Sequence, residues 1–177
     1  MKQLLSLNTT SLLELPMITQ IRRNHALEHA TLHTLSNLLP HTMLMGHSDF
    51  GGFWIIGDVQ NESLHSAVLE ALTRLRAGEY QLAIHPNCGT NYITAGTLAG
   101  LAGAAAMIGS GGRLRDKLGR LPFAAALATL ALIFSQPLGL LLQARVTTSA
   151  ELGSLEITSI SHKIQGRLTV HRIQTRA

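Results

Sequence analysis

The chain has 177 residues, of which 46% are hydrophobic and only 14% are charged. This length suits one ordinary domain or a small domain with a membrane anchor, and the positive mean hydropathy and 16 glycines favour the second arrangement. The single cysteine excludes an intramolecular disulfide and suits a reducing compartment. The net charge of +4 comes with no aromatic interleaving and no recognised nucleic-acid-binding motif, so we expect contact with anionic lipid and not with nucleic acid.

Residues 1–15 carry leucines without a sharp period, which is compatible with a short amphipathic helix on the membrane or with a loosely held arm. They show no signal peptide, because they lack a continuous apolar stretch and a small-residue cleavage site. Without an export signal, the globular part of the protein is expected to be cytoplasmic.

Residues 16–40 are expected to form one helix of about six turns, because proline suits the first turn of a helix and also its stop. At 100° per residue an apolar stripe emerges that also carries one carboxylate and two imidazoles. The stripe contains Ile18, Ile21, His25, Glu28, His29, Leu32, Leu35 and Leu39, while Arg22, Arg23, Ala30, Thr34 and Asn37 lie off it or at its edge. An inward carboxylate is costly when unpaired, so it needs a metal, a proton or a cation as partner.

The sequence HALEH at positions 25–29 has the form H-x-x-E-H. Two histidines four positions apart on a helix can hold one divalent ion, and the glutamate beside them can orient or deprotonate water. The motif resembles that of the inverse zincins, the pitrilysin-like metallopeptidases. The resemblance implies that His25 and His29 are zinc ligands and Glu28 the general base, with Glu62 and Glu70 as nearby candidates for that family's distal glutamate ligand. The alternative is a pair of core histidines hydrogen-bonded to Glu28 and to the backbone.

The next segments predict the rest of a small α+β unit. Two apolar runs, residues 43–45 and 53–56, flank a glycine-containing segment and predict a β-hairpin. The sequence Asn-Glu-Ser at positions 61–63 opens a second helix, which Gly78 ends. Alternation in residues 80–84 predicts a third strand. The expected order is helix, strand, strand, helix, strand, with two helices covering one face of the sheet.

Residues 85–91, HPNCGTN, form the second stretch rich in reactive side chains. Histidine and cysteine are good zinc ligands, and a catalytic zinc site has three protein ligands with one open position. Cys88 or His85 is therefore the candidate third ligand, with Cys88 slightly favoured. Two alternatives are open: Cys88 is a nucleophile of low pKa beside His85, or the segment is a capped turn in which Cys88 is inert.

Residues 91–112 and 121–144 contain no charged side chain, and each is long enough for a bilayer crossing of about 20 residues. We expect a transmembrane helical hairpin, and hence a multi-pass integral membrane protein with the lipid bilayer as its partner. Gly96 and Gly100 have the G-x-x-x-G spacing, which predicts a close helix contact within the hairpin or in a homodimer. Pro137 is expected to kink the second helix or to leave one of its backbone carbonyls without a helical partner.

Residues 155–161 and 167–174 show partial alternation and predict a C-terminal β-hairpin. The expected fold class is therefore α+β, in three parts. Residues 1–90 form the α+β domain with the His/Glu motif, residues 91–144 the transmembrane hairpin, and residues 145–177 the C-terminal hairpin that completes the sheet.

Three segments, RRNHALEHATLHTL, GHSDFGGFWIIGDV and LAIHPNCGTN, precede a glycine-rich hydrophobic stretch. As a set they resemble a family of small bacterial integral membrane proteins of unknown function. The likeness extends over most of the chain. It implies an integral membrane protein and assigns no activity.

These observations lead to three functional hypotheses. The first is a membrane-anchored metal-dependent hydrolase of the peptidase or amidase type, with zinc as its cofactor and an unknown substrate. The second is a non-catalytic membrane scaffold or assembly factor whose His/Glu cluster binds a metal or stabilises the core. The third is binding of a cofactor or tetrapyrrole through an axial histidine.

Overall fold

The computed structural model describes residues 12–166 and 168–177, so the interpretation of residues 1–15 lies mostly outside the described part of the chain. The chain forms two compact units. The first contains the residues up to His85 together with Ala144–Ala177, and the second is Pro86–Gln143.

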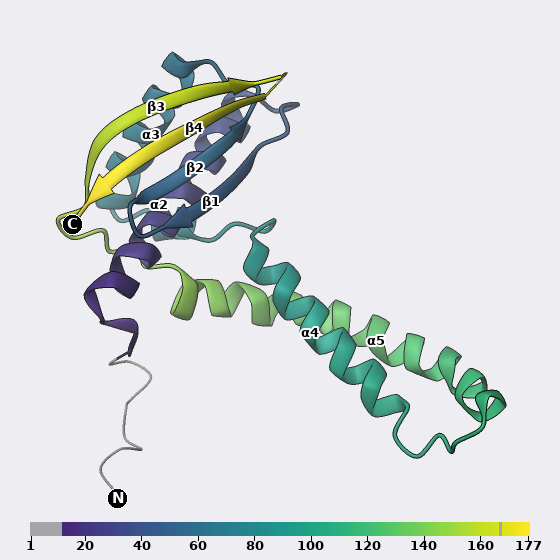
Figure 1. The fold of residues 1–177 in the computed structure, drawn as a ribbon. Coiled ribbons are helices and arrows are strands. Elements are labelled where there is room, and N and C mark those ends of the chain that lie inside the picture. The colour runs from purple at the N-terminus through teal and green to yellow at the C-terminus, as the bar shows by residue number, and fades with distance from the viewer. Residues whose placement is uncertain (1–11, 167) are drawn as a thin grey trace, which may run out of the picture. The chain divides into compact units, whose positions relative to one another are not determined.

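An antiparallel sheet with the strand order β1-β2-β4-β3 forms one layer of the first unit (Figure 1). Strands β1 (Met45–Asp49) and β2 (Gly52–Gly57) form one hairpin, and β3 (Glu156–Gln165) and β4 (Leu168–Arg176) form another. Strand β4 pairs with β2, so the two ends of the chain share one sheet. The α+β fold class and the C-terminal β-hairpin are confirmed.

Two helices, α2 (Pro16–Leu38) and α3 (Asn61–Arg76), lie together on one face of this sheet (Figure 1). Pro16 occupies the first turn of α2, as expected from its missing amide hydrogen. Gly78 has a φ of 94°, a value that suits glycine, and it follows the end of α3. The hydrophobic core between helices and sheet includes the fully buried side chains of Leu27, Leu35, Phe53, Ile55, Leu64, Leu75 and Ile173.

The buried surface of α2 is wider than the predicted stripe. Ala30 and Thr34, which were expected to lie off the stripe or at its edge, are buried, whereas Ile18 and Ile21 are only half-buried. The reason is that α2 contacts α3 as well as β1 and β2, so its middle is covered from more than one side.

The predicted strand at residues 80–84 is wrong, because Tyr80–Ala83 forms a 3₁₀ helix, η1. A tight turn precedes it: the amide of Glu79 donates to the carbonyl of Arg74, and the Arg74 guanidinium binds the Glu79 carboxylate at 2.7 Å. Leu82 and Ala83 are buried in the core. An alternation of five residues does not separate a short strand from one 3₁₀ turn, and β4 occupies the place beside β2.

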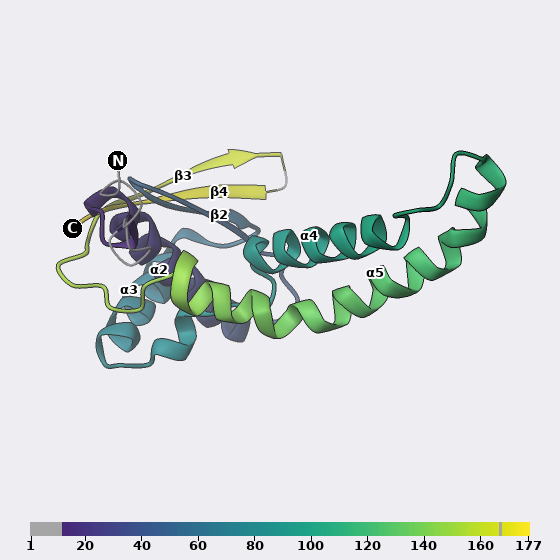
Figure 2. The ribbon, with the colours of Figure 1, turned by 90° about the horizontal axis from the view of Figure 1, so that it is seen from below.

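The second unit is a pair of packed helices, α4 (Gly89–Ala106) and α5 (Leu114–Leu142) (Figure 2). A π-helical turn, Gln143–Thr147, follows α5 in the chain, and all of its residues after Gln143 belong to the first unit. Arg120 of α5 donates hydrogen bonds to the carbonyls of Ala106 and Ile108 at the end of α4. A cation at the carboxyl end of a helix also interacts favourably with the helix dipole. Arg120 therefore stabilises the contact between α4 and α5.

Among the described residues, one helix, Leu114–Thr147, is long and apolar enough to cross a membrane. The expected two-span transmembrane hairpin and multi-pass topology are not supported. Helix α4 has 18 residues and contains Thr90, Asn91 and several glycines, so it is too weakly apolar to count as a second span.

The Gly96 and Gly100 face of α4 does not pack against α5. A Cβ added at either glycine would meet no heavy atom within 4 Å. The close contact expected within the hairpin is therefore not formed at these residues, and homodimerisation through them stays a prediction. Helix α5 runs without interruption through Pro122 and Pro137, each of which lacks a backbone amide donor.

Candidate metal site

Four histidines gather in the first unit, three on α2 and one after η1. His25, His29 and His33 recur at intervals of four along α2, so their side chains form a row on the helix surface. The ring centroids of His25 and His29 are 4.3 Å apart. The ring of His85 lies 5.7 Å from that of His29 and 4.7 Å from that of His33.

Backbone carbonyls determine which nitrogen of each α2 imidazole carries the hydrogen. Nδ1 of His25 lies 3.0 Å from the carbonyl oxygen of Thr147, and Nδ1 of His29 lies 2.7 Å from that of Ala83. A carbonyl only accepts, so both Nδ1 atoms are donors and Nε2 is the nitrogen with the lone pair in each neutral ring. His33 is arranged oppositely, because its Nε2 donates to the carbonyl of Ile84 at 2.8 Å.

The carboxylate of Glu28 lies beside this row and faces strand β1. Its side chain is 4% exposed and accepts a short hydrogen bond from the Ser48 hydroxyl. A Cβ at Gly46 would lie 2.8 Å from Cγ of Glu28, so only glycine leaves room for this side chain. Burial raises the pKa of the Glu28 carboxyl, and the Ser48 hydrogen bond and the charges of His25 and His47 partly oppose this rise.

The imidazole of His85 has a lowered pKa. Burial, followed by the nearby His33 and His29 rings, lowers the pKa of His85 to about 4. Its imidazole is therefore neutral at pH 7, which is the protonation state that a metal ligand requires.

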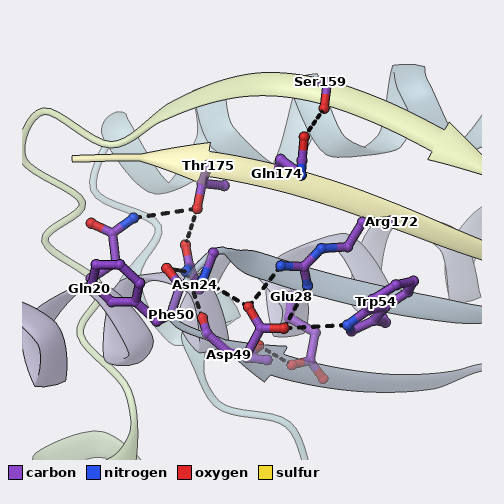
Figure 3. A network of polar contacts seen from close by, with 12 residues as sticks. Gln20, Asn24, Glu28, Asp49, Phe50, Trp54, Ser159, Arg172, Gln174 and Thr175 are labelled. Carbon is purple, nitrogen blue, oxygen red and sulfur yellow. Dashed lines mark hydrogen bonds and ion pairs between the residues drawn. The ribbon is translucent and has the colours of Figure 1, made fainter.

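A second polar network continues from α2 to the sheet (Figure 3). The buried Asn24 amide donates to the carbonyls of Asp49 and Phe50 at 2.8 and 3.2 Å, and its oxygen accepts from the Thr175 hydroxyl at 2.6 Å. Arg172 binds both carboxylate oxygens of Asp49, at 2.8 and 2.7 Å. The Asn24 bonds hold the first half of α2, which carries His25, against the end of β1 and against β4, and Arg172 joins these two strands to each other.

The structure brings together His25, His29, His85 and Glu28, all in the first unit. Cys88 belongs to the second unit, where it precedes α4 and its Sγ accepts a hydrogen bond from the Thr90 amide at 3.4 Å. This contact is the one expected of a capped turn, and the role of Cys88 as a third ligand stays a prediction. Glu70 pairs with Arg74 at 3.4 Å on an exposed helix face, and no described contact connects Glu70 or Glu62 with the histidines.

Sequence reasoning gives His33 only as one of several possible auxiliary ligands, together with His41, His47 and His65, and it misses Ser48 and Gly46 as members of the cluster. The signal for His33 was present, because it follows His29 by one more interval of four on the same helix face. Ser48 and Gly46 carry no local signal, since only the pairing of α2 with β1 brings them to Glu28.

Comparison with known proteins gives a family but no activity. The chain is 38% identical over 142 residues to an uncharacterized protein of Picosynechococcus sp., an alignment that covers 75% of this chain and 67% of that protein. No solved structure matches the chain. Residues 20–160, which include most of α2, all of β1 and β2, and both helices of the second unit, match DUF6391. The chain therefore belongs to the DUF6391 family, a domain of unknown function.

Proposed function

We propose that the protein is a membrane-anchored, zinc-dependent hydrolase of the peptidase or amidase type, with His25 and His29 as zinc ligands. The observation that carries the proposal is the shared tautomer of these two rings: each donates its Nδ1 hydrogen to a backbone carbonyl and has its lone pair on Nε2. Metal-ligating histidines characteristically have this arrangement, because the carbonyl orients the ring and increases the basicity of the ligand nitrogen.

The third protein ligand is His85 or Cys88. His85 ends the first unit beside His29, and Cys88 follows it by three positions in the chain. Imidazole and thiolate are both ordinary zinc ligands, and three of them with one open position make a catalytic site.

Zinc would act as a Lewis acid that polarises the scissile carbonyl group. Glu28 would accept a proton from the attacking water, and burial raises its pKa, which makes it a stronger base than an exposed carboxylate. The Ser48 hydroxyl orients the Glu28 carboxylate, and Gly46 provides the space in which this carboxylate sits beside β1.

Helix α5 is the proposed membrane anchor. Only 11% of its most apolar window is buried within the protein, and it exposes large side chains such as Ile133 and Phe134. Large apolar side chains in such a continuous helix favour a lipid environment. The globular unit would then lie at the membrane surface, on the cytoplasmic side.

The burial of Glu28 favours a second candidate, a non-catalytic scaffold or assembly factor. A carboxylate that is 4% exposed and hydrogen-bonded to Ser48 can equally serve to organise the core. In that case a metal on His25 and His29 would be structural.

Metal analysis of the full-length protein, purified in detergent, tests the site. The wild type is expected to hold one zinc per chain, and His25→Ala and His29→Ala are expected to lose it. His65→Ala, which changes an exposed histidine on α3, is the matched control and should retain zinc. A folded, metal-free wild-type protein that does not take up added zinc would rule out the metal site.

Activity then distinguishes the two candidates. Hydrolysis of a library of quenched fluorescent peptides should be lost in Glu28→Gln, while zinc content stays at the wild-type level. If the zinc-loaded wild type cleaves no peptide or amide, the scaffold is favoured. An absorbance spectrum of the same preparation reports any bound tetrapyrrole.

A further inference from the structure

A second site lies away from the histidine row, where β2 leads into α3. Here the residues that follow β2 and begin α3 meet the end of the β3–β4 hairpin, and together they line a pocket of about 400 Å³. The residues used below are Asp58, Asn61, Glu62, His162 and His171, and we call this the strand-end pocket. None of them belongs to the proposed zinc site.

The pocket contains a buried imidazole with an unused acceptor. His171 has no exposed surface, and its Nε2 donates to the carbonyl oxygen of Val59 at 3.1 Å. Its Nδ1 therefore carries the lone pair, and this atom has no hydrogen-bond partner among the described residues. An unpaired buried acceptor is costly, so the site is suited to a ligand that donates a hydrogen bond.

A second acceptor and two carboxylates line the same pocket. Oδ1 of Asn61 is also buried without a hydrogen-bond partner in the described part of the chain. Asp58 and Glu62 line the pocket with exposed side chains, and Glu62 lies in the first turn of α3, where it offsets the positive end of the helix dipole. The pocket therefore presents acceptors and negative charge together.

His162 completes the lining, and its position follows from the strand register. It pairs directly with His171 across β3 and β4, so both side chains lie on the same face of the sheet, with ring centroids 5.9 Å apart. Burial is the main cause that lowers the pKa of His171, so this ring is neutral and accepts at Nδ1 near pH 7.

We propose that the strand-end pocket binds a small organic cation that carries N–H donors, such as an alkylammonium or alkylguanidinium group. The N–H groups would donate to Nδ1 of His171 and Oδ1 of Asn61, and Asp58 and Glu62 would balance the positive charge. The ligand needs both N–H donors and a positive charge. The donors match the two unpaired acceptor atoms, and the charge matches the two carboxylates.

The test uses full-length protein in detergent with ¹⁵N-labelled histidine, and four probes at equal concentration. Methylguanidine and methylamine have charge and donors, tetramethylammonium has charge without donors, and urea has donors without charge. The proposal predicts that the first two shift the ¹⁵N resonance of His171 Nδ1 with saturation, and that the last two do not.

Two variants locate the site. Glu62→Gln removes an exposed charge and should weaken methylguanidine binding about threefold, while Asn61→Leu removes an acceptor and should weaken it about tenfold. Glu70→Gln, on the same helix but outside the pocket, should bind like the wild type. The proposal is overturned if tetramethylammonium binds as well as methylguanidine, if no probe shifts His171, or if zinc alone occupies His162 and His171.

Discussion

Gly46 lies so close to Glu28 that a Cβ at position 46 would come 2.8 Å from Cγ of the glutamate. Strand β1 can therefore approach α2 only because this residue has no side chain. The same approach brings the Ser48 hydroxyl to the Glu28 carboxylate.

Gly46→Ala is expected to destabilise the protein by about 1–3 kcal/mol, because the added methyl group must displace Glu28 or β1. Thermal unfolding measures this effect, with Gly89→Ala as control, since no heavy atom lies within 4 Å of a Cβ there. Equal stability of Gly46→Ala and wild type would contradict this packing.

Glu28→Gln is expected to change how stability depends on pH in the metal-free protein. The pKa of Glu28 is raised in the folded state, so its contribution to stability is fully present below the ordinary value of 4.5 and is lost as pH rises through the folded pKa. The substituted amide can still accept the Ser48 hydrogen bond but does not titrate. The variant should therefore become progressively more stable than the wild type above pH 4.5, as measured by denaturant unfolding with a chelator present. A constant difference across this range would argue against a raised pKa.

His85 is expected to make the folded protein less stable as the pH falls, whereas Glu28 makes it less stable as the pH rises. Its pKa is lowered from 6.5 to about 4 in the folded protein, so the unfolded chain binds more protons and stability falls as pH decreases through this window. The ring is partly exposed, so solvent screening reduces the effect. His85→Gln should flatten the stability profile between these pH values, as measured by denaturant unfolding.

The elements with long periodic signals could be predicted from the sequence, and the elements fixed by distant contacts could not. The helix that begins at Pro16 and the hairpin turn near Gly51 follow from proline, glycine and apolar spacing. Residues 80–84 were misassigned because a five-residue alternation is too short to separate a strand from a 3₁₀ turn. The expected span at residues 91–112 is not supported, because its glycines, threonines and asparagine lower the hydropathy of a segment that is otherwise long enough.

In the candidate site, too, the residues on one helix could be predicted from the sequence, whereas their contacts with distant residues could not. His25, Glu28 and His29 were identified from spacing alone, because one helix carries all three. Two hydrogen bonds set the tautomers of the histidines. One joins His25 to Thr147, 122 positions away, and the other joins His29 to Ala83, 54 positions away. No local pattern records such contacts, since they depend on how the chain returns to α2.

Arg172→Lys is expected to weaken the link between β1 and β4. Burial acts to raise the pKa of Asp49, but the hydrogen bonds and charge of Arg172 outweigh it, so the net pKa is lowered. Lysine cannot make the two parallel bonds of the guanidinium, so the loss should be about 0.5–1 kcal/mol, because Asp49 is 42% exposed. An NMR titration should show a higher pKa for Asp49 in the variant. An unchanged Asp49 pKa would mean that Arg172 does not make this pair in solution.

Leu130→Lys tests whether α5 crosses a membrane. Leu130 is 49% exposed near the middle of the helix, so in water a lysine there should change stability by no more than about 0.5 kcal/mol. At the centre of a bilayer the same charge costs about 3 kcal/mol and should reduce insertion. Leu118→Lys, an equally accessible leucine in the charged first turns of α5, is the matched control. Carbonate extraction of membranes should release Leu130→Lys but neither the wild type nor Leu118→Lys, whereas extraction of the wild type would show that α5 does not span the bilayer.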